Sequence, residues 1–261
     1  MTSRRKLIAG NWKMNASLAG NEDLLRGLIA GLNALKAEVG QEALPEILVC
    51  PPAPYWSQVG ALLESSGIVQ GAQDVSEHPK GAYTSELSVS MLQDFKLEHV
   101  ILGHSECRRD QFQTDNLITR KVATVFQAGL IPVVCVGETQ QEREQGQTQA
   151  VIKSQVLSAL SLLPMDFDRV VMAYEPVWAI GTGLTATPPM AQEVHSLIRG
   201  LLASRTHHAH ALRILYGGSM NASNAQTLLA QPDIDGGLIG SAALSSSDFL
   251  SIISAAVARN P

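Results

Sequence analysis

The sequence is poor in the residue types that mark several protein classes. Only three cysteines occur among 261 residues, and no two have the spacing C-x-x-C. An odd, small cysteine count argues against a disulfide framework or a zinc motif, so we expect a reducing, cytoplasmic location. No apolar run approaches the ~18 residues of a membrane span. The apolar run after Lys6 is only Leu7–Ala9, too short for a signal peptide, and we expect no membrane association.

Charge is also scarce. Charged residues make up 16% of the chain, and the formal net charge is −5. A mildly acidic chain is poorly suited to non-specific nucleic-acid binding, so we expect no nucleic-acid partner. An anionic substrate would therefore need a local positive site. The apolar content of 45% is enough for a sizeable core.

Eight short apolar runs alternate with segments of helical periodicity. The runs end about every 33 residues, close to the length of one βαβ unit, and they lack the strict alternation of half-exposed strands. They are Lys6–Asn11, Ile47–Pro51, Ile68–Gln73, Val100–Gly103, Ile131–Gly137, Val170–Glu175, Arg213–Gly217 and Gly237–Gly240. No linker or low-complexity tract interrupts them, so we expect one domain over residues 1–261.

The intervening segments carry helix signals. Apolar residues recur at helical spacing over Leu24–Leu32 and Val194–Leu202. The pair Pro188-Pro189 suits a first helical turn. Thr114 is a suitable cap for a helix that ends at Gly129.

Eight strands alternating with helices fit either an open doubly wound sheet or a closed barrel. Reactive residues follow the first, fourth and sixth runs, and glycine-rich turns follow the seventh and eighth. An open sheet has its crevice at one switch point, whereas a barrel gathers all strand ends around one mouth. The distribution favours an α/β fold, a single-domain (β/α)8 barrel of eight parallel strands.

Three of these strand ends carry residues suited to acid–base chemistry. Lys13, in Gly10–Asn15, can hold an anion as a point charge, or it is a solvated loop lysine. His104 leaves the fourth run where a helix begins, and a helix N-terminus disfavours imidazolium. The alternative is that His104 is a structural histidine whose hydrogen bonds are made within the barrel rim. Glu106, beside Arg108 and Arg109, is either functional or part of a surface ion-pair cluster.

Glu175 ends the sixth apolar run, where a carboxylate is costly unless it has a function or a partner. The following segment, Pro176–Gly183, is apolar in what must be a loop. Such a loop either closes over a ligand or packs permanently on the rim.

Glycine-rich turns close the seventh and eighth strand ends, Tyr216–Ser219 and Ile239–Ala243. Turns of this kind expose backbone N–H groups that bind phosphate, commonly after the last two strands of a barrel. The alternative is that both are ordinary tight turns.

Three other patterns point elsewhere, each weakly. Gly103–Cys107 nearly matches the nucleophile elbow of a serine hydrolase, but cysteine stands where the sharp turn needs a small residue. Gly181–Ala186 resembles a dinucleotide fingerprint, but it starts six residues after the strand end. A cluster of three histidines has no adjacent carboxylate cluster and fits a solvated loop better than a metal site: His207, His208 and His210.

Four segments together resemble the signatures of the triosephosphate isomerase family, in the family's order and across essentially the whole chain. They are Gly10–Asn15, Gly103–Glu106, Tyr174–Gly183 and Tyr216–Ser219. The resemblance implies interconversion of dihydroxyacetone phosphate and D-glyceraldehyde 3-phosphate through an enediolate, in glycolysis and gluconeogenesis, without cofactor or metal. The alternatives are another phosphate-binding barrel enzyme acting on a sugar phosphate and a non-catalytic binding protein.

The resemblance also implies roles for individual residues. Glu175 would be the base, and neutral His104 would polarise the carbonyl and move protons between the two oxygens. Lys13 would hold substrate charge with Asn11 beside it, and Glu106 would be a supporting carboxylate. The phosphate would be bound by N–H groups of Gly181, Ser219, Gly240 and Ser241.

The segment Gln73–Glu86 resembles the loop that projects into a twin subunit, which implies a homodimer. Four positions depart from the family's usual pattern. Cys107 stands where an arginine is expected and Ser85 where a glycine is common, both near the implied dimer contact. Leu184 replaces a frequent lysine at the end of the closing loop, and Ser241 replaces the second glycine of the phosphate turn.

Overall fold

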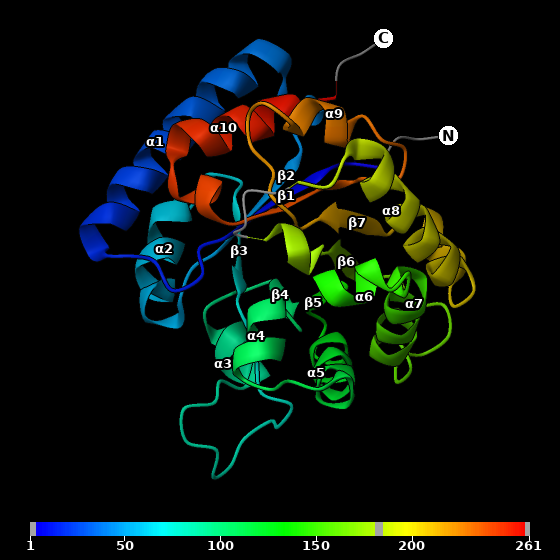
Figure 1. Ribbon diagram of the computed structural model, residues 1–261. Helices are drawn as coiled ribbons and strands as arrows, with labels where there is room; N and C mark the ends of the chain where they lie inside the picture. The colour runs from blue at the N-terminus through cyan, green and yellow to red at the C-terminus, as the bar shows by residue number, and fades with distance from the viewer. Residues whose placement is uncertain (1–3, 181–184, 259–261) are drawn as a thin grey trace.

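Eight parallel strands form a closed barrel in the computed structural model, which describes residues 4–180 and 185–258. Each strand pairs with the next along the chain, and β8 pairs with β1 (Figure 1). The strands are β1 Leu7–Asn11, β2 Glu46–Cys50, β3 Val69–Ala72, β4 His99–Leu102, β5 Ile131–Val136, β6 Val171–Tyr174, β7 Arg213–Tyr216 and β8 Gly236–Ile239.

All eight predicted runs are strands, with ends that differ by at most one residue. The open-sheet alternative is wrong, because Leu7 of β1 pairs with Gly236 of β8. Gly236 has φ +150°, and a Cβ at this position would overlap the carbonyl of Leu7. A glycine at the seam therefore lets the last strand come close enough to the first to close the barrel.

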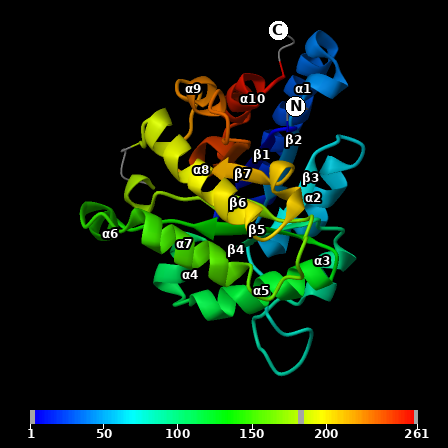
Figure 2. The ribbon, with the colours of Figure 1, turned by 90° about the vertical axis from the view of Figure 1, so that its right-hand side faces the viewer.

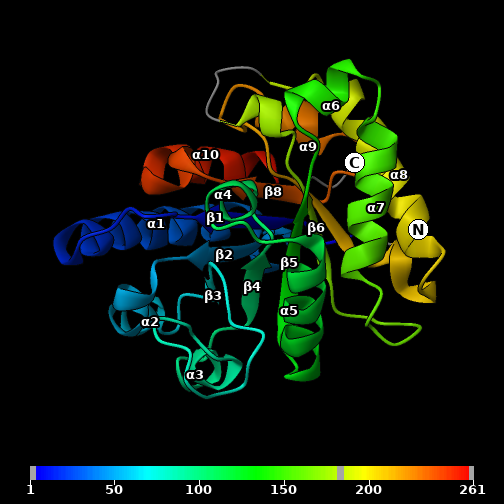
Figure 3. The ribbon, with the colours of Figure 1, turned by 60° about the horizontal axis from the view of Figure 1, so that its bottom comes forward.

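Helices surround the barrel (Figures 1 and 3). They are α1 Leu18–Val39, α2 Trp56–Leu63, α3 Val89–Asp94, α4 Ser105–Asp110, α5 Asp115–Gln127, α6 Gln140–Glu144, α7 Thr148–Ala159, α8 Pro188–Ala203, α9 Ala225–Leu229 and α10 Ser246–Ala255. Short 3-10 turns are η1 Gln41–Ala43, η2 Ala53–Tyr55, η3 Val177–Ala179, η4 His207–His210 and η5 Ser241–Leu244. Among the described residues, no helix is long and apolar enough to cross a membrane.

The predicted helix starts are confirmed. The side chain of Thr114 accepts a hydrogen bond from the N–H of Leu117 and caps α5. Helix α8 begins at Pro188, and its cap Thr187 accepts from the N–H of Met190. Proline fits the first turn because its missing N–H would have no partner within the helix.

Two apolar layers make up the core. One lies between strands and helices, and the other fills the barrel itself with side chains such as Leu48, Ile101 and Leu215. Two residues before each of these, at the amino ends of their strands, stand Glu46, His99 and Arg213. Nη1 of Arg213 lies 2.5 Å from Oε2 of Glu46, whose Oε1 lies 3.5 Å from Nε2 of His99. Because strand side chains alternate with a period of two, this polar layer faces the barrel interior.

The segment between β3 and α3, residues 73–88, extends away from the barrel (Figures 1 and 2). The N–H of Ser76 donates to the carbonyl of Leu87 at 2.7 Å and closes its neck. Helix α5 anchors the same end, where Arg120 pairs with Glu77 and Lys121 lies 2.8 Å from Oδ2 of Asp74. We call residues 73–88 the projecting loop.

Candidate active site

A cavity of about 450 Å³ lies at the carboxyl ends of the strands. Residues that follow β1, β4, β6, β7 and β8 line it, so the barrel brings together positions far apart in sequence. The predicted site residues in its lining are Asn11, Lys13, His104, Glu106, Glu175, Ser219, Gly240 and Ser241. The ninth, Gly181, lies outside the described residues, as does Leu184.

The imidazole of His104 is held by a backbone hydrogen bond at the start of α4. The backbone N–H of Glu106 donates to Nδ1 of His104 at 3.2 Å. A ring nitrogen that accepts a hydrogen bond carries no proton, which assigns the proton to Nε2. Nε2 lies 3.1 Å from Oε1 of Glu175, and the imidazole is buried. The ring therefore offers an N–H to the cavity beside the carboxylate.

The carboxylate of Glu175 is buried, with 2% of the residue exposed. The N–H of Ser105 donates to Oε2 at 3.0 Å. Two glycines make room for the residue: a Cβ on Gly137 would overlap the carbonyl of Glu175, and a Cβ on Gly217 would lie 2.8 Å from its Cγ. Glu175 is thus held between Gly137 and Gly217, which can approach it closely because neither has a side chain.

Lys13 adopts a left-handed backbone, with φ 53°, which is uncommon for a residue other than glycine. The Oδ1 atom of Asn11 accepts from its N–H at 3.0 Å, and Nε2 of Gln73 donates to its carbonyl at 2.8 Å. Its Nζ lies 2.6 Å from Oε1 of Glu106. Strained backbone of this kind clusters at functional sites, and here it directs the ammonium group into the cavity.

The surface-cluster alternative for Glu106 is wrong. Glu106 pairs with Lys13, whereas Arg108 pairs with Asp115 and Arg109 with Asp110. The carboxylate thus belongs to the cavity and holds the ammonium group in place.

The two glycine-rich turns form part of the cavity wall. Ser241 opens η5, whose first N–H groups have no acceptor within the short helix. A Cβ on Gly240 would lie 3.5 Å from Cε of Lys13, so this turn adjoins the lysine. The carbonyl of Ser219 accepts from Nδ2 of Asn224 at 3.0 Å, which fixes the other turn. The N–H of Gly217 donates to the carbonyl of Tyr174, so this glycine serves packing rather than ligand binding.

The described part of the expected closing loop packs on the barrel rim. Ala179 is fully buried, and the indole N–H of Trp178 donates to Oε1 of Glu138 at 3.0 Å. Val177 and Ile180 line the cavity. The loop's apolar character is thus explained over these residues by contact with the rim and the cavity; residues 181–184 lie outside the described part of the chain.

The sequence did not predict the roles of two residues that support the site, Gln73 and Ser105. Gln73 holds the carbonyls of both Lys13 and Cys50, at 2.8 and 2.9 Å. It directly follows β3, so the signal that identified Glu175, a polar residue at a strand end, also marks Gln73. Ser105 acts through its backbone N–H, which its side-chain type does not reveal. Within residues 4–180 and 185–258, no group of three or more histidine, cysteine, aspartate or glutamate side chains could hold a metal.

A closed barrel with a glutamate, a histidine and a lysine around one mouth is typical of a (β/α)8-barrel enzyme that acts on a small anionic substrate. The family model described as triosephosphate isomerase matches residues 6–256. A triosephosphate isomerase of Paracidovorax citrulli is 52% identical over 254 residues, 97% of this chain and 99% of its own. That of Herminiimonas arsenicoxydans is 54% identical over 97% of this chain and all of its own, and that of Nitrosococcus oceani is 47% identical over 97% and 99%.

The chain belongs to the triosephosphate isomerase family. It is an aldose–ketose isomerase, and its reaction interconverts dihydroxyacetone phosphate and D-glyceraldehyde 3-phosphate, a step of glycolysis. Family membership over nearly the whole chain leaves no place for the serine hydrolase, the dinucleotide-binding protein or a barrel enzyme of another family.

Proposed function

We propose that Glu175 and His104 carry the proton transfers of this reaction. The carboxylate of Glu175 removes a proton from the carbon next to the substrate carbonyl and returns it to the neighbouring carbon. The Nε2–H of His104 donates to the substrate oxygen as negative charge develops there, and the imidazole then moves protons between the two oxygens of the enediolate. The single observation that carries this proposal is the 3.1 Å separation of Nε2 and Oε1, with Nδ1 already occupied as an acceptor.

Geometry supports a neutral rather than a cationic electrophile. A protonated Nδ1 would face the backbone N–H of Glu106, so the two hydrogens would oppose each other. The neutral ring avoids this conflict and keeps its one proton on the side of the cavity. A neutral donor of this kind can both give a proton to one enediolate oxygen and take one from the other.

Lys13 supplies positive charge to the site. Its ammonium group lies between Glu106 and the turn at Gly240, so it can contact both an oxygen near the reacting carbons and a phosphate held by the turn. Asn11 and Gln73 hold the strained backbone that places it. We propose that Ser219, Gly240 and Ser241, together with Gly181, present N–H groups to the phosphate.

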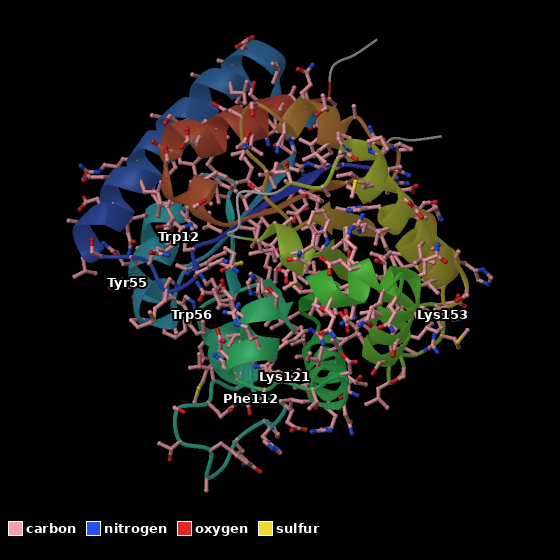
Figure 4. The ribbon with its side chains drawn as sticks, viewed as in Figure 1. Trp12, Tyr55, Trp56, Phe112, Lys121 and Lys153 are labelled. Carbon is pink, nitrogen blue, oxygen red and sulfur yellow. The ribbon has the colours of Figure 1, made fainter. Side chains whose placement is uncertain are left out.

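We further propose a homodimer through the projecting loop. Large apolar side chains are exposed on this side of the molecule: Met14 is 96% exposed and Phe112 81%. Phe112 lies near Lys121, close to the base of the projecting loop, in Figure 4. Met14 directly follows Lys13, so a partner that covered it would also steady the catalytic loop. A monomer would leave these side chains in water.

The remaining proposals concern organisation and location. We propose that residues 1–261 act as one domain, because the family model spans residues 6–256 without a break. We propose a cytoplasmic location, supported by three free cysteines of which two are buried.

The test is a coupled assay on the purified full-length chain with D-glyceraldehyde 3-phosphate, reading dihydroxyacetone phosphate, with EDTA in the isomerase step. We expect fast turnover that EDTA leaves unchanged. The assignment of the base is tested by Glu175→Asp, for which we expect turnover to fall about a hundredfold or more, because a shorter arm withdraws the carboxylate. Wild-type turnover in that variant would refute the role of Glu175.

A further inference from the structure

A second cavity, of about 290 Å³, opens at the opposite end of the barrel. Residues that lead into β1, β5, β6 and β7 line it, at the amino ends of these strands, so it is separate from the active site. Its volume is near the lower end of the range for small-molecule sites. We call it the amino-end cavity.

The lining of this cavity carries more positive than negative charge. Its charged residues are Arg5, Arg169, Arg213 and Asp168. Three guanidinium groups thus face one carboxylate, in a chain whose overall charge is negative. Like charges that share a cavity repel each other, so this surplus favours the binding of an anion.

The three arginines differ in how far they are already neutralised. Arg213 pairs with Glu46, at the polar layer within the barrel. Arg5 donates only to the carbonyls of Leu44 and Pro45, and among the described residues it has no carboxylate within ion-pair distance.

Arg169 has the most donor capacity left. Its nearest carboxylate contact is Asp168, at 3.9 Å, and its guanidinium stacks 4.9 Å from the ring centre of Phe126. Stacking fixes the plane of the guanidinium and uses none of its N–H donors.

A neighbouring pair of arginines shows that the surplus is local. Arg4 and Arg199 lie at the same end of the barrel, and both pair with Asp233 and Asp235. Structural arginines here are therefore matched by carboxylates, whereas those of the amino-end cavity are not.

The polar layer beneath the cavity does not cancel the surplus. Glu46 is shared between Arg213 and His99, and both ring nitrogens of His99 lack a hydrogen-bond partner. Burial lowers the pKa of His99 to about 4, opposed by Glu46 and assisted by Arg213, so the imidazole is neutral near pH 7. The layer as a whole is neutral, which leaves Arg5 and Arg169 in the cavity against the single carboxylate of Asp168.

We propose that the amino-end cavity binds a small multivalent oxyanion, of the phosphate or polycarboxylate class, through Arg5, Arg169 and Arg213. Guanidinium groups match the oxygens of phosphate and carboxylate in paired hydrogen bonds, and an ammonium group does not. Asp168 opposes binding by competing for Arg169. The site is independent of turnover because none of these residues contacts the active-site cavity.

The experiment is calorimetric titration of the full-length protein with inorganic pyrophosphate, with the inhibition constant for turnover measured in parallel. The inhibition constant reports the active site, and any further saturable binding reports the amino-end cavity. We expect Arg169→Gln to weaken the second binding event about tenfold and Asp168→Asn to tighten it. The matched control Arg26→Gln removes an exposed arginine outside both cavities and should change neither. All three variants should keep wild-type turnover and melting temperature.

Two results would overturn the proposal. One is a single class of sites, for pyrophosphate and for citrate alike, whose dissociation constant equals the inhibition constant. The other is a second site that responds to Arg169→Gln no more than to Arg26→Gln. Repeating the titration with citrate separates phosphate from polycarboxylate recognition. Second-site binding of either anion that Arg169→Gln weakens supports the assignment, and second-site binding of neither refutes it.

Discussion

Replacing Gly217 by alanine should disable the proposed base without touching it. A Cβ at this position would lie 2.8 Å from Cγ of Glu175 and 3.2 Å from the carbonyl of Tyr174. Carbon atoms pack best at about 3.5–4.0 Å, so the two groups must separate by roughly 1 Å. The carbonyl is part of β6 and cannot yield easily, which leaves the carboxylate arm of Glu175 to move. A misplacement of about 1 Å costs about a hundredfold in turnover.

The assay is the steady-state turnover of Gly217→Ala beside Gly200→Ala. Gly200 lies in α8, where an added Cβ meets nothing within 4 Å, so this control should keep full turnover. Melting temperatures separate misplacement from unfolding. We expect Gly217→Ala to lower kcat with the chain still folded and KM little changed.

A double-mutant cycle sharpens the test. Gly217→Ala and Glu175→Asp act on the same carboxylate, so their effects on the activation free energy should be far from additive. Additive losses would mean that Gly217 does not act through the carboxylate of Glu175. Full turnover of Gly217→Ala would refute the argument that close packing at this glycine fixes the base.

Three further predictions concern charge, burial and backbone strain. Lys13→Met should abolish measurable binding of a phosphate-bearing inhibitor by calorimetry; tight binding would contradict its role. The free energy of unfolding should fall as pH drops from about 6.5 to 4. Burial lowers the pKa of both His99 and His195 to about 4 in the folded protein. In the unfolded chain the same histidines take up protons from about pH 6.5, so acid favours unfolding. Each contributes about 3 kcal/mol, so His99→Leu should give a visibly shallower denaturation profile against pH. Ser85→Gly, at φ 75°, should stabilise the protein by roughly 0.5–1 kcal/mol and strengthen the dimer in sedimentation, whereas Ser65→Gly, at φ 62° outside the projecting loop, should affect stability alone.

Much of the fold was predictable because of how a parallel barrel buries its strands. Each strand is covered on both faces, so its sequence is mostly apolar, and polar residues mark where it ends. That rule found all eight strands, and it found His104 and Glu175 at strand ends. The topology then required these positions to meet, although 71 positions separate them along the chain.

The features that the sequence did not predict depend on how closely backbone segments approach one another. The support of Glu175 by Gly137 and Gly217 arises where two neighbouring strands run close to a third, and nothing in the sequence assigns a glycine to that contact. The polar layer was missed for a related reason. Glu46 and Arg213 are the first residues of their strands. The predicted runs left out Glu46 and included Arg213, and neither run indicated the direction of these side chains. Only the register shows that they face inward.

The two departures near the projecting loop have different physical consequences. Cys107 stands where the family's usual arginine would supply a charge, yet Asp74 is already satisfied: Lys121 lies 2.8 Å away, and Nε2 of Gln113 donates to it at 2.7 Å. Burial raises the pKa of the Cys107 thiol to about 11, so the group is neutral and imposes no charge of its own. Ser85, by contrast, occupies left-handed backbone that glycine adopts freely. The base of the loop thus has its charges balanced, and the remaining cost to the proposed dimer lies in the left-handed backbone at Ser85.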